Sequence, residues 1–559
     1  MHRAAHRERV DMLQSLRDRD LFGARRTRTR ADAQRSLQLR SQMRELAARQ
    51  RRLERGGAMP FRFAVQFADV AAAGGFSLVI GNPPWVRPHA LSQTERLQVR
   101  AEFRTMRHAA WKTGALRAGA GVGFAAQADL AVAFVERSVQ LLKPDGIMSL
   151  LVPAKLWRAL AGGGLRAFLR QQTTVLTVRD WSDAPALFDA AVYPSLLVAQ
   201  RNNAVDNDVI DLAAAVERVG PESNSRGSGA VHLATTAECH APIHVTVARR
   251  HNTARFVVRP DALSLNGDVA APWLLMPESA RSAFQRVHDA GPALGDSSLG
   301  RPLLGVKCGC NAAFLVAAHE HDDDTAQIES EQRIGIIERR MLRPVMRGET
   351  LHDAHATRRV RTPGKPGTDA RIVWTHDSDD RPYRRLPPHA SRWLSHWRSR
   401  LERRTDGNAS TPWWSLFRTA SAQCGSPRVV WADIGKTLRA VVLDAGDPTV
   451  ALNSCYVLRT SCDDDARALH TLLTSPVAGA WFEALAEPAR GGFRRYLGWT
   501  VATMPIPQHW LSARHTLAEY WKEHADGTAR DPFEHSAVVA DAFGIPLRHL
   551  EPLLRWYRL

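Results

Sequence analysis

A short apolar run that ends abruptly in a proline-rich loop places the strongest constraint on how this chain folds. Residues 76–80 have the pattern of a buried strand and are followed at once by Gly81-Asn-Pro-Pro-Trp85. Two successive prolines fix φ and remove two backbone donors, so the strand must end there. A helical face over residues 129–142, a turn at residues 143–146 and an apolar strand over residues 147–152 follow.

The alternation continues along the chain. We expect a helix over residues 155–169 and strands over residues 175–178 and 193–198. Near-continuous apolar strands that alternate with helices predict an α/β sheet covered on both faces. Residues 303–507 contain short β-like runs with many tryptophans, and the last fifty residues have helical periodicity. The expected fold class is therefore α/β, followed by a mixed, β-rich region and a helical C-terminus.

The charge of the chain is strongly basic and unevenly distributed. The net charge is +18, and half of the excess lies in residues 1–57, which hold sixteen arginines and seven acidic residues. Such an excess favours a polyanionic partner, nucleic acid before a membrane. Residues 31–55 predict a long basic helix that ends at Gly56-Gly57. This helix is a solvated surface element, a phosphate contact or the tail of a longer upstream domain.

Several classes of protein are excluded by composition. No apolar run reaches the roughly 18 residues that a membrane helix needs, and the Arg-rich start leads into no apolar signal segment. We therefore expect a cytoplasmic protein with no membrane partner. Cys308 and Cys310 lack a second ligand pair at zinc spacing, so no metal site is expected. The cysteines are too few and too irregular for a disulfide framework, standing at positions 239, 308, 310, 424, 455 and 462.

The loop after the first expected strand contains the candidate catalytic residues. The prolines leave the Asn82 side-chain oxygen and the Pro83 carbonyl free to accept hydrogen bonds at the carboxyl edge of the sheet, where ligands of open α/β folds bind. Two acceptors at one point suit the two hydrogens of an aromatic exocyclic amine, and leave its nitrogen able to attack an electrophilic methyl group. Trp85 offers a stacking platform for a base flipped out of a duplex. The alternative is a rigid turn with a packed tryptophan.

In these residues the sequence resembles the amino-group DNA methyltransferases, specifically the TaqI-like N6-adenine enzymes and their large restriction-modification relatives. Residues 61–69 and 74–87 are similar to that family's fourth strand and catalytic loop. Residues 128–153 are similar to its next helix and strand, and residues 187–194 to its later aromatic motif. The resemblance implies a partial Rossmann-like methyltransferase sheet, the cofactor S-adenosylmethionine and duplex DNA as partner.

The resemblance also implies roles for individual residues. It makes the loop catalytic and places Phe188 against the flipped base on the face opposite to Trp85. It puts Asp129 and Phe134 on the cofactor side, although residues such as Phe188 and Phe134 are more often core residues and one such as Asp129 is more often a plain helix cap. The catalytic set implied by the resemblance is Asn82, Pro83, Pro84, Trp85 and Phe188.

The second half resembles the target-recognition region of the same enzymes. The similar segments are residues 305–314, 342–348, 489–496 and 504–507. Arginines among Gly, Tyr and Trp in these segments suit contacts with phosphates and base edges, or a solvated surface. The arginines concerned are Arg343, Arg347, Arg490, Arg494 and Arg495.

The expected organisation has five parts. They are a basic helical leader (1–57), the catalytic half of a methyltransferase domain (58–201), a linker or small subdomain (202–290), a target-recognition domain (291–510) and a C-terminal helical segment (511–559).

One family feature is missing. The cofactor loop of the type Asp-Pro-Ala-x-Gly-x-Gly does not occur upstream of Asn82, and Gly119-Ala-Gly-Val-Gly123 follows the catalytic loop with no clear strand before it. The chain is therefore expected to be a fragment, or to depend on a separate polypeptide that carries the S-adenosylmethionine motif, and to be inactive alone. The expected activity is adenine-specific DNA methylation in a restriction-modification or phage-defence system. The alternatives are cytosine-N4 methylation and a non-catalytic DNA-binding specificity protein.

Overall fold

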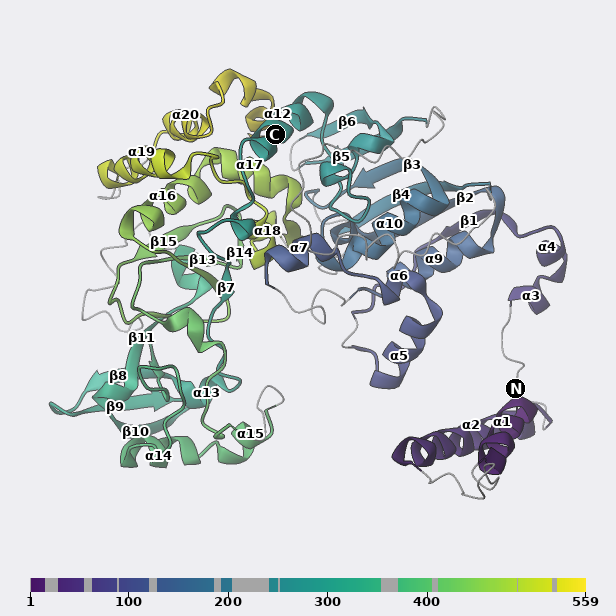
Figure 1. Cartoon of the computed structure of the whole chain (residues 1–559), viewed down its shortest axis with the longest axis horizontal. Coiled ribbons are helices and arrows are strands. Elements are labelled where there is room, and N and C mark those ends of the chain that lie inside the picture. The colour runs from purple at the N-terminus through teal and green to yellow at the C-terminus, as the bar shows by residue number, and fades with distance from the viewer. Residues whose placement is uncertain are drawn as a thin grey trace, which may run out of the picture. The chain divides into compact units, whose positions relative to one another are not determined.

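A computed structural model gives the fold of this chain (Figure 1). It describes residues 2–15, 29–54, 63–87, 90–119, 128–184, 193–203, 241–249, 252–352, 370–404, 411–489, 491–524 and 530–558. The chain divides into two compact units, Met1–Gly75 and Phe76–Leu559.

The first unit is helical. Helix α1 (His2–Ser15) packs against α2 (Arg30–Glu54), and two short helices, α3 (Phe63–Gln66) and α4 (Ala68–Ala72), follow. Leu39 of α2 is buried, and Met43 and Leu46 of the same helix are half-buried. The helix expected over residues 31–55 is confirmed.

The second unit begins with a six-stranded sheet in the order β1-β2-β4-β3-β5-β6. The pairs β1–β2 and β3–β5 are parallel, and the others are antiparallel. All four expected strands are present, and β1 ends the sheet. The strands are β1 (Phe76–Gly81), β2 (Leu142–Pro153), β3 (Thr173–Asp180), β4 (Pro194–Arg201), β5 (Ile243–Ala248) and β6 (Thr253–Val258).

Helices surround one face of this sheet. Helix α9 (Ala131–Leu141) packs on β2 and α10 (Gly163–Gln172) packs on β3 (Figure 1). The register places Val79, Met148 and Val178 on the face toward these helices, where Met148 and Val178 are fully buried and Val79 packs against the core. The described residues between β1 and α9 include the smaller helices α5 (Gln93–Glu102), α6 (Arg104–Arg107) and α7 (Lys112–Arg117).

The opposite face of the sheet is open at its β1 edge. Leu78 is 52% exposed and Ile80 is 73% exposed, and their neighbours across β2 are only partly buried. The expectation that helices cover both faces is therefore wrong at β1. Parallel strands are normally covered on both sides, so this edge is unusual.

The helix expected over residues 155–169 is broken into three pieces. Two 3-10 turns, Ala154–Trp157 and Leu160–Gly162, come before α10. The break occurs at three successive glycines that pack against backbone: a Cβ at Gly163 would lie 2.6 Å from Trp111 N, and one at Gly164 would lie 2.4 Å from His108 O. Glycine is needed for this close backbone approach, and α10 begins only at Gly163.

The region expected as a linker or small subdomain (202–290) differs from the structure. Strands β5 and β6 join the first sheet, and α12 (Glu278–Asp289) packs against the C-terminal helix α21 (Glu551–Arg558). The reason is that alternate β5 side chains, such as Val245 and Val247, continue the buried face of β3. That pairing partner lies more than 60 residues earlier, beyond the reach of a local pattern.

The β-rich second half is confirmed, and its described residues form three sheets. Their orders are β10-β9-β8-β12-β11-β16, β15-β13-β17-β7 and β14-β19-β18. Their strands are β7 (Leu303–Leu304), β8 (Leu315–Glu320), β9 (Thr325–Ser330), β10 (Arg333–Glu338), β11 (Leu342–Met346), β12 (Ala370–Val373), β13 (Arg428–Ala432), β14 (Ile434–Gly435), β15 (Ala440–Leu443), β16 (Val450–Ala451), β17 (Cys455–Arg459), β18 (Glu487–Ala489) and β19 (Phe493–Arg495).

Helices accompany these sheets and form the C-terminus, so the fold class is mixed α/β, with the helical C-terminus as expected. Helix α16 begins at three aspartates, which are favourable charges at a helix start. The helices are α13 (Asn311–Phe314), α14 (Pro388–Ser395), α15 (Arg398–Glu402), α16 (Asp463–Thr474), α17 (Pro476–Leu485), α18 (Gly498–Ala502), α19 (Trp510–Glu523), α20 (Pro532–Ala542) and α21.

A buried ionic cluster joins the first sheet to the C-terminal half. The Arg494 guanidinium on β19 contacts Asp183, which follows β3, and Glu483 of α17. Arg249, just after β5, donates to Glu483 over 2.6 Å. Burial by itself raises the pKa of Glu483, but the guanidiniums of Arg494 and Arg249 outweigh it and hold the pKa below its ordinary value. Glu483 is therefore stabilised in its ionised form.

We expect Arg494→Ala to lower the free energy of unfolding by about 3–5 kcal/mol, because it leaves two carboxylates buried without their main partner. Urea unfolding measures this loss. Arg555→Ala is the control, since Arg555 forms an exposed pair with Glu551 on α21 and is expected to cost less than about 1 kcal/mol. Equal stabilities of the two variants would contradict a structural role for the cluster.

Candidate active site

The expected catalytic loop leaves the sheet at the carboxyl end of β1. Asn82 is exposed, and its side chain makes no hydrogen bond with any residue that the structure describes. Pro83 is buried and Pro84 is exposed. The two prolines carry the chain out of the strand between these environments, which leaves the Asn82 amide at the surface and able to bind a ligand.

Two hydrogen bonds fix the end of this loop. The Trp85 indole Nε1 donates to the Leu151 carbonyl of β2 over 3.3 Å, and Leu130 N donates to the Val86 carbonyl over 3.0 Å. Trp85 is half-buried. The loop is therefore tied both to the neighbouring parallel strand and to the residue before α9, which holds the indole in one orientation.

Asp129 lies at the start of α9, next to the loop. Its carboxylate is 3% exposed, accepts a hydrogen bond from Ala131 N over 3.2 Å and pairs with Lys155 Nζ at 3.2 Å. The expected helix cap is thus present in modified form, since the cap position itself is Leu130. The structure accounts for this buried carboxylate by backbone and lysine contacts.

The other predicted residues are placed differently. Phe134 lies on α9 with 43% of its surface exposed, so it is not a core residue. Phe188 lies outside the described residues, as do residues 120–127 of the glycine-containing segment that begins at Gly119. The structure therefore brings together Asn82–Trp85 and Asp129, with Phe134 farther along α9.

Two polar residues near this site were not predicted. Lys155 comes from the turn after β2 and pairs with Asp129. Glu487 on β18 is half-buried, and desolvation raises its pKa against the opposing charges of Arg495, Lys155 and Arg166. Glu487 follows Asn82 by some 400 residues, so no local pattern could have connected the two.

The predicted DNA-contacting arginines are largely occupied by protein groups. Arg494 is 2% exposed within the ionic cluster. Arg343 lies over the Trp374 ring at 4.4 Å and donates to the carbonyls of Pro448 and Ala422. Arg347 and Arg495 are half-buried, and Arg490 lies outside the described residues. Arg343 and Arg494 therefore hold the fold together rather than face a ligand.

The cysteines of residues 308 and 310 are buried, and burial raises the pKa of the Cys308 thiol to about 12. Among the residues that the structure describes, no group of three His, Cys, Asp or Glu side chains is placed to hold a metal ion. In that same part of the chain, no helix is long and apolar enough to cross a membrane.

The contacts of Asp129 generate a test of its structural role. We expect Asp129→Ala to lower the free energy of unfolding by about 1–2 kcal/mol, because it removes the acceptor for Ala131 N and the partner of Lys155. Asp129→Asn keeps an acceptor oxygen and is expected to cost less than about 1 kcal/mol. Chemical denaturation of both variants measures the difference, and equal losses would show that the backbone contact contributes nothing.

The known proteins that this chain is similar to are methylases and methyltransferases. Residues 12–188 match the family model described as Eco57I restriction-modification methylase. The Type II methyltransferase M.PaeR7I of Pseudomonas aeruginosa is 23% identical over 78% of this chain and 65% of its own length. M.XhoI of Xanthomonas vasicola is 22% identical over 80% of this chain and 71% of its own length.

The chain thus spans about two thirds of the length of these relatives. Among solved structures, the Type IIL restriction-modification enzyme MmeI in complex with DNA is similar, with a TM-score of 0.46 and 10% identity over 86% of this chain and 53% of MmeI. From residue 12 to residue 188, this chain is therefore similar to restriction-modification methylases of the Eco57I type.

Proposed function

We propose that this chain is the catalytic and DNA-recognition part of a DNA methyltransferase that methylates N6 of adenine in duplex DNA, in a restriction-modification or phage-defence system. The observation that carries the proposal is the loop after β1, which holds an exposed Asn82 beside a fixed Trp85 at the carboxyl edge of the sheet. The family match over residues 12–188 supports it. We assign catalysis to residues 58–201 and DNA recognition to residues 291–510.

In this proposal the chain's own residues bind and orient the target amine. The Asn82 side-chain oxygen and the Pro83 carbonyl each accept one hydrogen of the amine, which draws the nitrogen lone pair out of conjugation with the ring. Pro84 contributes by fixing the backbone between them and Trp85. Trp85 stacks on the flipped base, with its edge held by the Leu151 carbonyl. Phe188 is assigned to the opposite face of the base.

The chemistry that S-adenosylmethionine supplies when bound is an electrophilic methyl group. Two residues of this chain lie on the side assigned to it: Phe134 offers an exposed aromatic ring, and Asp129 is largely taken up by Lys155 and Ala131. These two residues fit only part of a cofactor site, and the glycine loop of the family is missing from the sequence. We propose that a separate polypeptide supplies the remainder.

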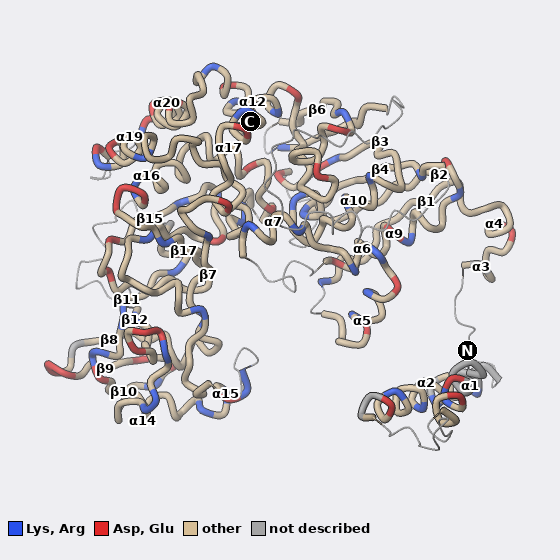
Figure 2. Tube along the Cα trace, in the orientation of Figure 1, with Lys and Arg blue, Asp and Glu red and all other residues tan. Residues whose placement is uncertain are grey.

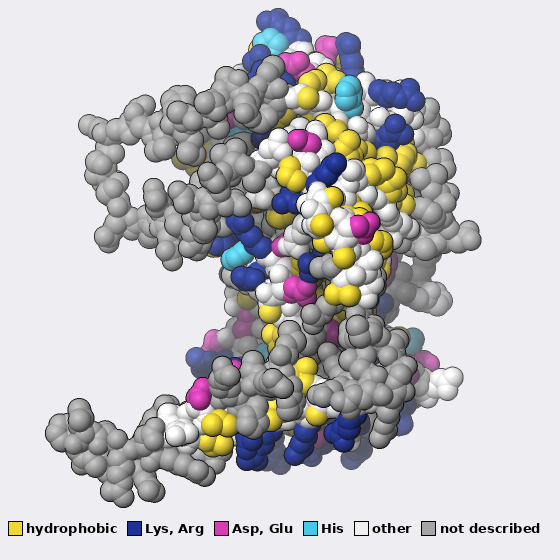
Figure 3. Space-filling model, turned by 90° about the vertical axis from the view of Figure 1, so that its right-hand side faces the viewer, with side chains coloured by type: hydrophobic (Ala, Val, Ile, Leu, Met, Phe, Trp, Pro, Cys, Tyr) yellow, Lys and Arg dark blue, Asp and Glu magenta, His cyan; other side chains and the backbone are white. Residues whose placement is uncertain are grey.

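The open edge of the first sheet supports such a partner. Of the described strands only β2 pairs with β1, so one row of β1 backbone groups is available for a further strand. Leu78 and Ile80 add exposed apolar surface on the same strand. Figure 3 views the molecule from the side of this edge and shows hydrophobic side chains at the surface. Such an edge is what a second half of a methyltransferase sheet would cover.

Asn82→Ala tests the catalytic assignment. In a preparation reconstituted with the missing half, we expect loss of methyl transfer by about 100-fold or more, since one of two positioning acceptors is removed, while DNA binding is unchanged. Thr94→Ala, an exposed change on α5, is the control. Unchanged activity of the Asn82 variant would overturn the assignment.

The modified nucleoside distinguishes the alternatives. Mass spectrometry is expected to find N6-methyladenine in the product DNA, whereas N4-methylcytosine would favour the related cytosine enzymes. A chain that binds duplex DNA but gains no activity or S-adenosylmethionine binding with a partner would be a specificity protein.

The partner is tested with the polypeptide encoded immediately upstream of this chain. We expect the two to co-purify when co-expressed and Ile80→Glu to abolish the complex, because a carboxylate would be buried at the joined edge. Phe533→Glu on α20 is the matched control, since Phe533 is 64% exposed and Ile80 is 73% exposed. A complex that tolerates the Ile80 change would contradict the use of this edge.

A further inference from the structure

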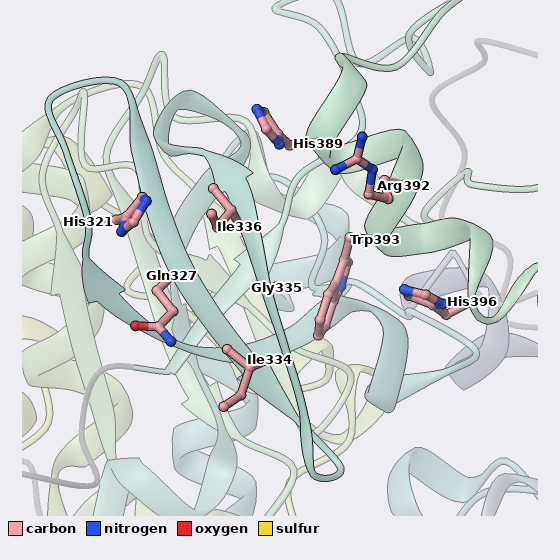
Figure 4. A pocket seen from close by; sticks show the side chains of 9 residues that line it. All are labelled: His321, Gln327, Ile334, Gly335, Ile336, His389, Arg392, Trp393 and His396. Carbon is pink, nitrogen blue, oxygen red and sulfur yellow. The ribbon is translucent and has the colours of Figure 1, made fainter.

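A groove in the β-rich half lies between helix α14 and the β9–β10 hairpin, with a cavity volume of about 440 Å³. Side chains of the helix form one wall and side chains of the strands form the other wall and the floor (Figure 4). The lining residues are His321, Gln327, Ile334, Gly335, Ile336, His389, Arg392, Trp393 and His396.

The walls of this groove are rigidly joined. Glu338 at the end of β10 accepts hydrogen bonds from His389 N over 2.9 Å and Ala390 N over 3.0 Å, which fixes the start of α14. The Trp393 indole donates to the Ala313 carbonyl over 2.9 Å. A Cβ at Gly335 would lie 2.7 Å from the Trp393 ring, so only glycine lets the helix approach β10 this closely. The groove is preorganised.

The helical wall belongs to the most arginine-rich described segment of this half. Residues 381–404 contain eight arginines and a single acidic residue, Glu402. Figure 2 shows these positive charges on α14 and α15. Glu402 pairs with Arg398 at 2.8 Å, and Arg404 turns inward to the Cys308 and Trp413 carbonyls.

The remaining guanidiniums of the segment face solvent. Five are exposed, and their guanidiniums make no ion pair or hydrogen bond with another described residue: Arg381, Arg384, Arg385, Arg392 and Arg400. Arginine side chains held at a surface without acidic partners suit bidentate contact with phosphate oxygens. The floor supplies apolar surface, since Ile334 is 67% exposed and Ile336 is 38% exposed, and this suits the faces of sugars between phosphates.

The charges around the groove also give it a direction. Three aspartates (residues 322–324) lie in the turn beyond His321, where Asp322 bonds to Thr325. They repel phosphates at that end. The positive end lies along α14 toward α15. A polyanion is therefore expected to enter along the helix and not over the β8–β9 turn that carries the aspartates.

We propose that this groove, extended by the exposed arginines of α14 and α15, binds the sugar–phosphate backbone of duplex DNA. The inference rests on the proposed function for its choice of DNA as the polyanion. It places the backbone contact on Arg392 and Arg400, and not on Arg343 and Arg494, which the fold itself uses.

Duplex DNA binding by the full chain, measured against salt concentration, tests the proposal. For Arg392→Ala/Arg400→Ala we expect the affinity to fall about 10-fold or more, and the slope of log K against log salt to fall by about 1.8, because two phosphate contacts are lost. The matched control is Arg286→Ala/Arg548→Ala, which removes the same charge at exposed positions on α12 and near α21.

A second pair of variants tests whether DNA binds in the groove, because both variants add the same negative charge at different positions. Ile334→Glu puts a carboxylate on the groove floor, and Leu511→Glu puts one on α19 at a position that is 75% exposed. We expect only the first to weaken binding. Both positions face solvent, so both variants are expected to keep the thermal stability of the parent.

The outcomes separate this inference from the proposed function. If the parent chain binds no duplex DNA even at low salt, both the DNA partner and the groove are overturned. If the parent binds DNA and the groove variants equal their controls, whether unchanged or equally weakened, the groove alone is overturned and methylation of DNA stands. A reduced slope for the arginine pair with weaker binding of the Ile334 variant supports the proposal.

Discussion

The contact of Arg494 with Asp183 and Glu483 joins parts of the chain that are far apart in sequence, and it links the end of the first sheet to the C-terminal half. Arg494 and Asp183 are 311 residues apart. Asp183 follows β3 closely, and Asp180 at the end of that strand pairs with Arg158 at 2.8 Å. Burial alone would raise the pKa of Asp180, but Arg158 and Ser182 keep it below its ordinary value. Charges of both signs are buried together here. Removal of one charged side chain therefore leaves the others buried without a partner of opposite charge.

This cluster lies at the same end of the sheet as the candidate active site. Strand β3 ends at Asp180, and β2 ends just before the turn that carries Lys155 and Arg158. Lys155 pairs with Asp129 beside the catalytic loop, while Arg158 pairs with Asp180 in the cluster. A single short turn thus connects the proposed catalytic loop with the C-terminal half. The proposed catalytic loop and the proposed DNA-recognition region are thus both linked to the turn that carries Lys155 and Arg158.

The local features of the fold could be predicted from the sequence, and the long-range ones could not. Strand β1 and its loop were predictable because two prolines act on their own backbone. The break before α10 was missed because its glycines respond to Trp111 and His108, about 50 residues earlier. Strand β5 was missed because its partner β3 lies beyond a long polar segment. In the site, Asn82 and Trp85 followed from the loop, whereas Lys155 and Glu487 required the folded chain.

The arginines show why net charge is a poor guide to the location of a polyanion. Arg158, Arg166, Arg428 and Arg494 are buried and bonded to carbonyls or carboxylates, so they add to the count of +18 without adding to the surface. A sequence motif selects arginines by their neighbours along the chain, but the groups that bind Arg343 and the Asp183 partner of Arg494 lie far from them in sequence. The exposed arginines of α14 and α15 have no family motif around them, and their lack of described acidic partners is visible only in the folded chain. The exposure of each basic side chain, and its pairing with other protein groups, therefore decide whether it can contact a phosphate.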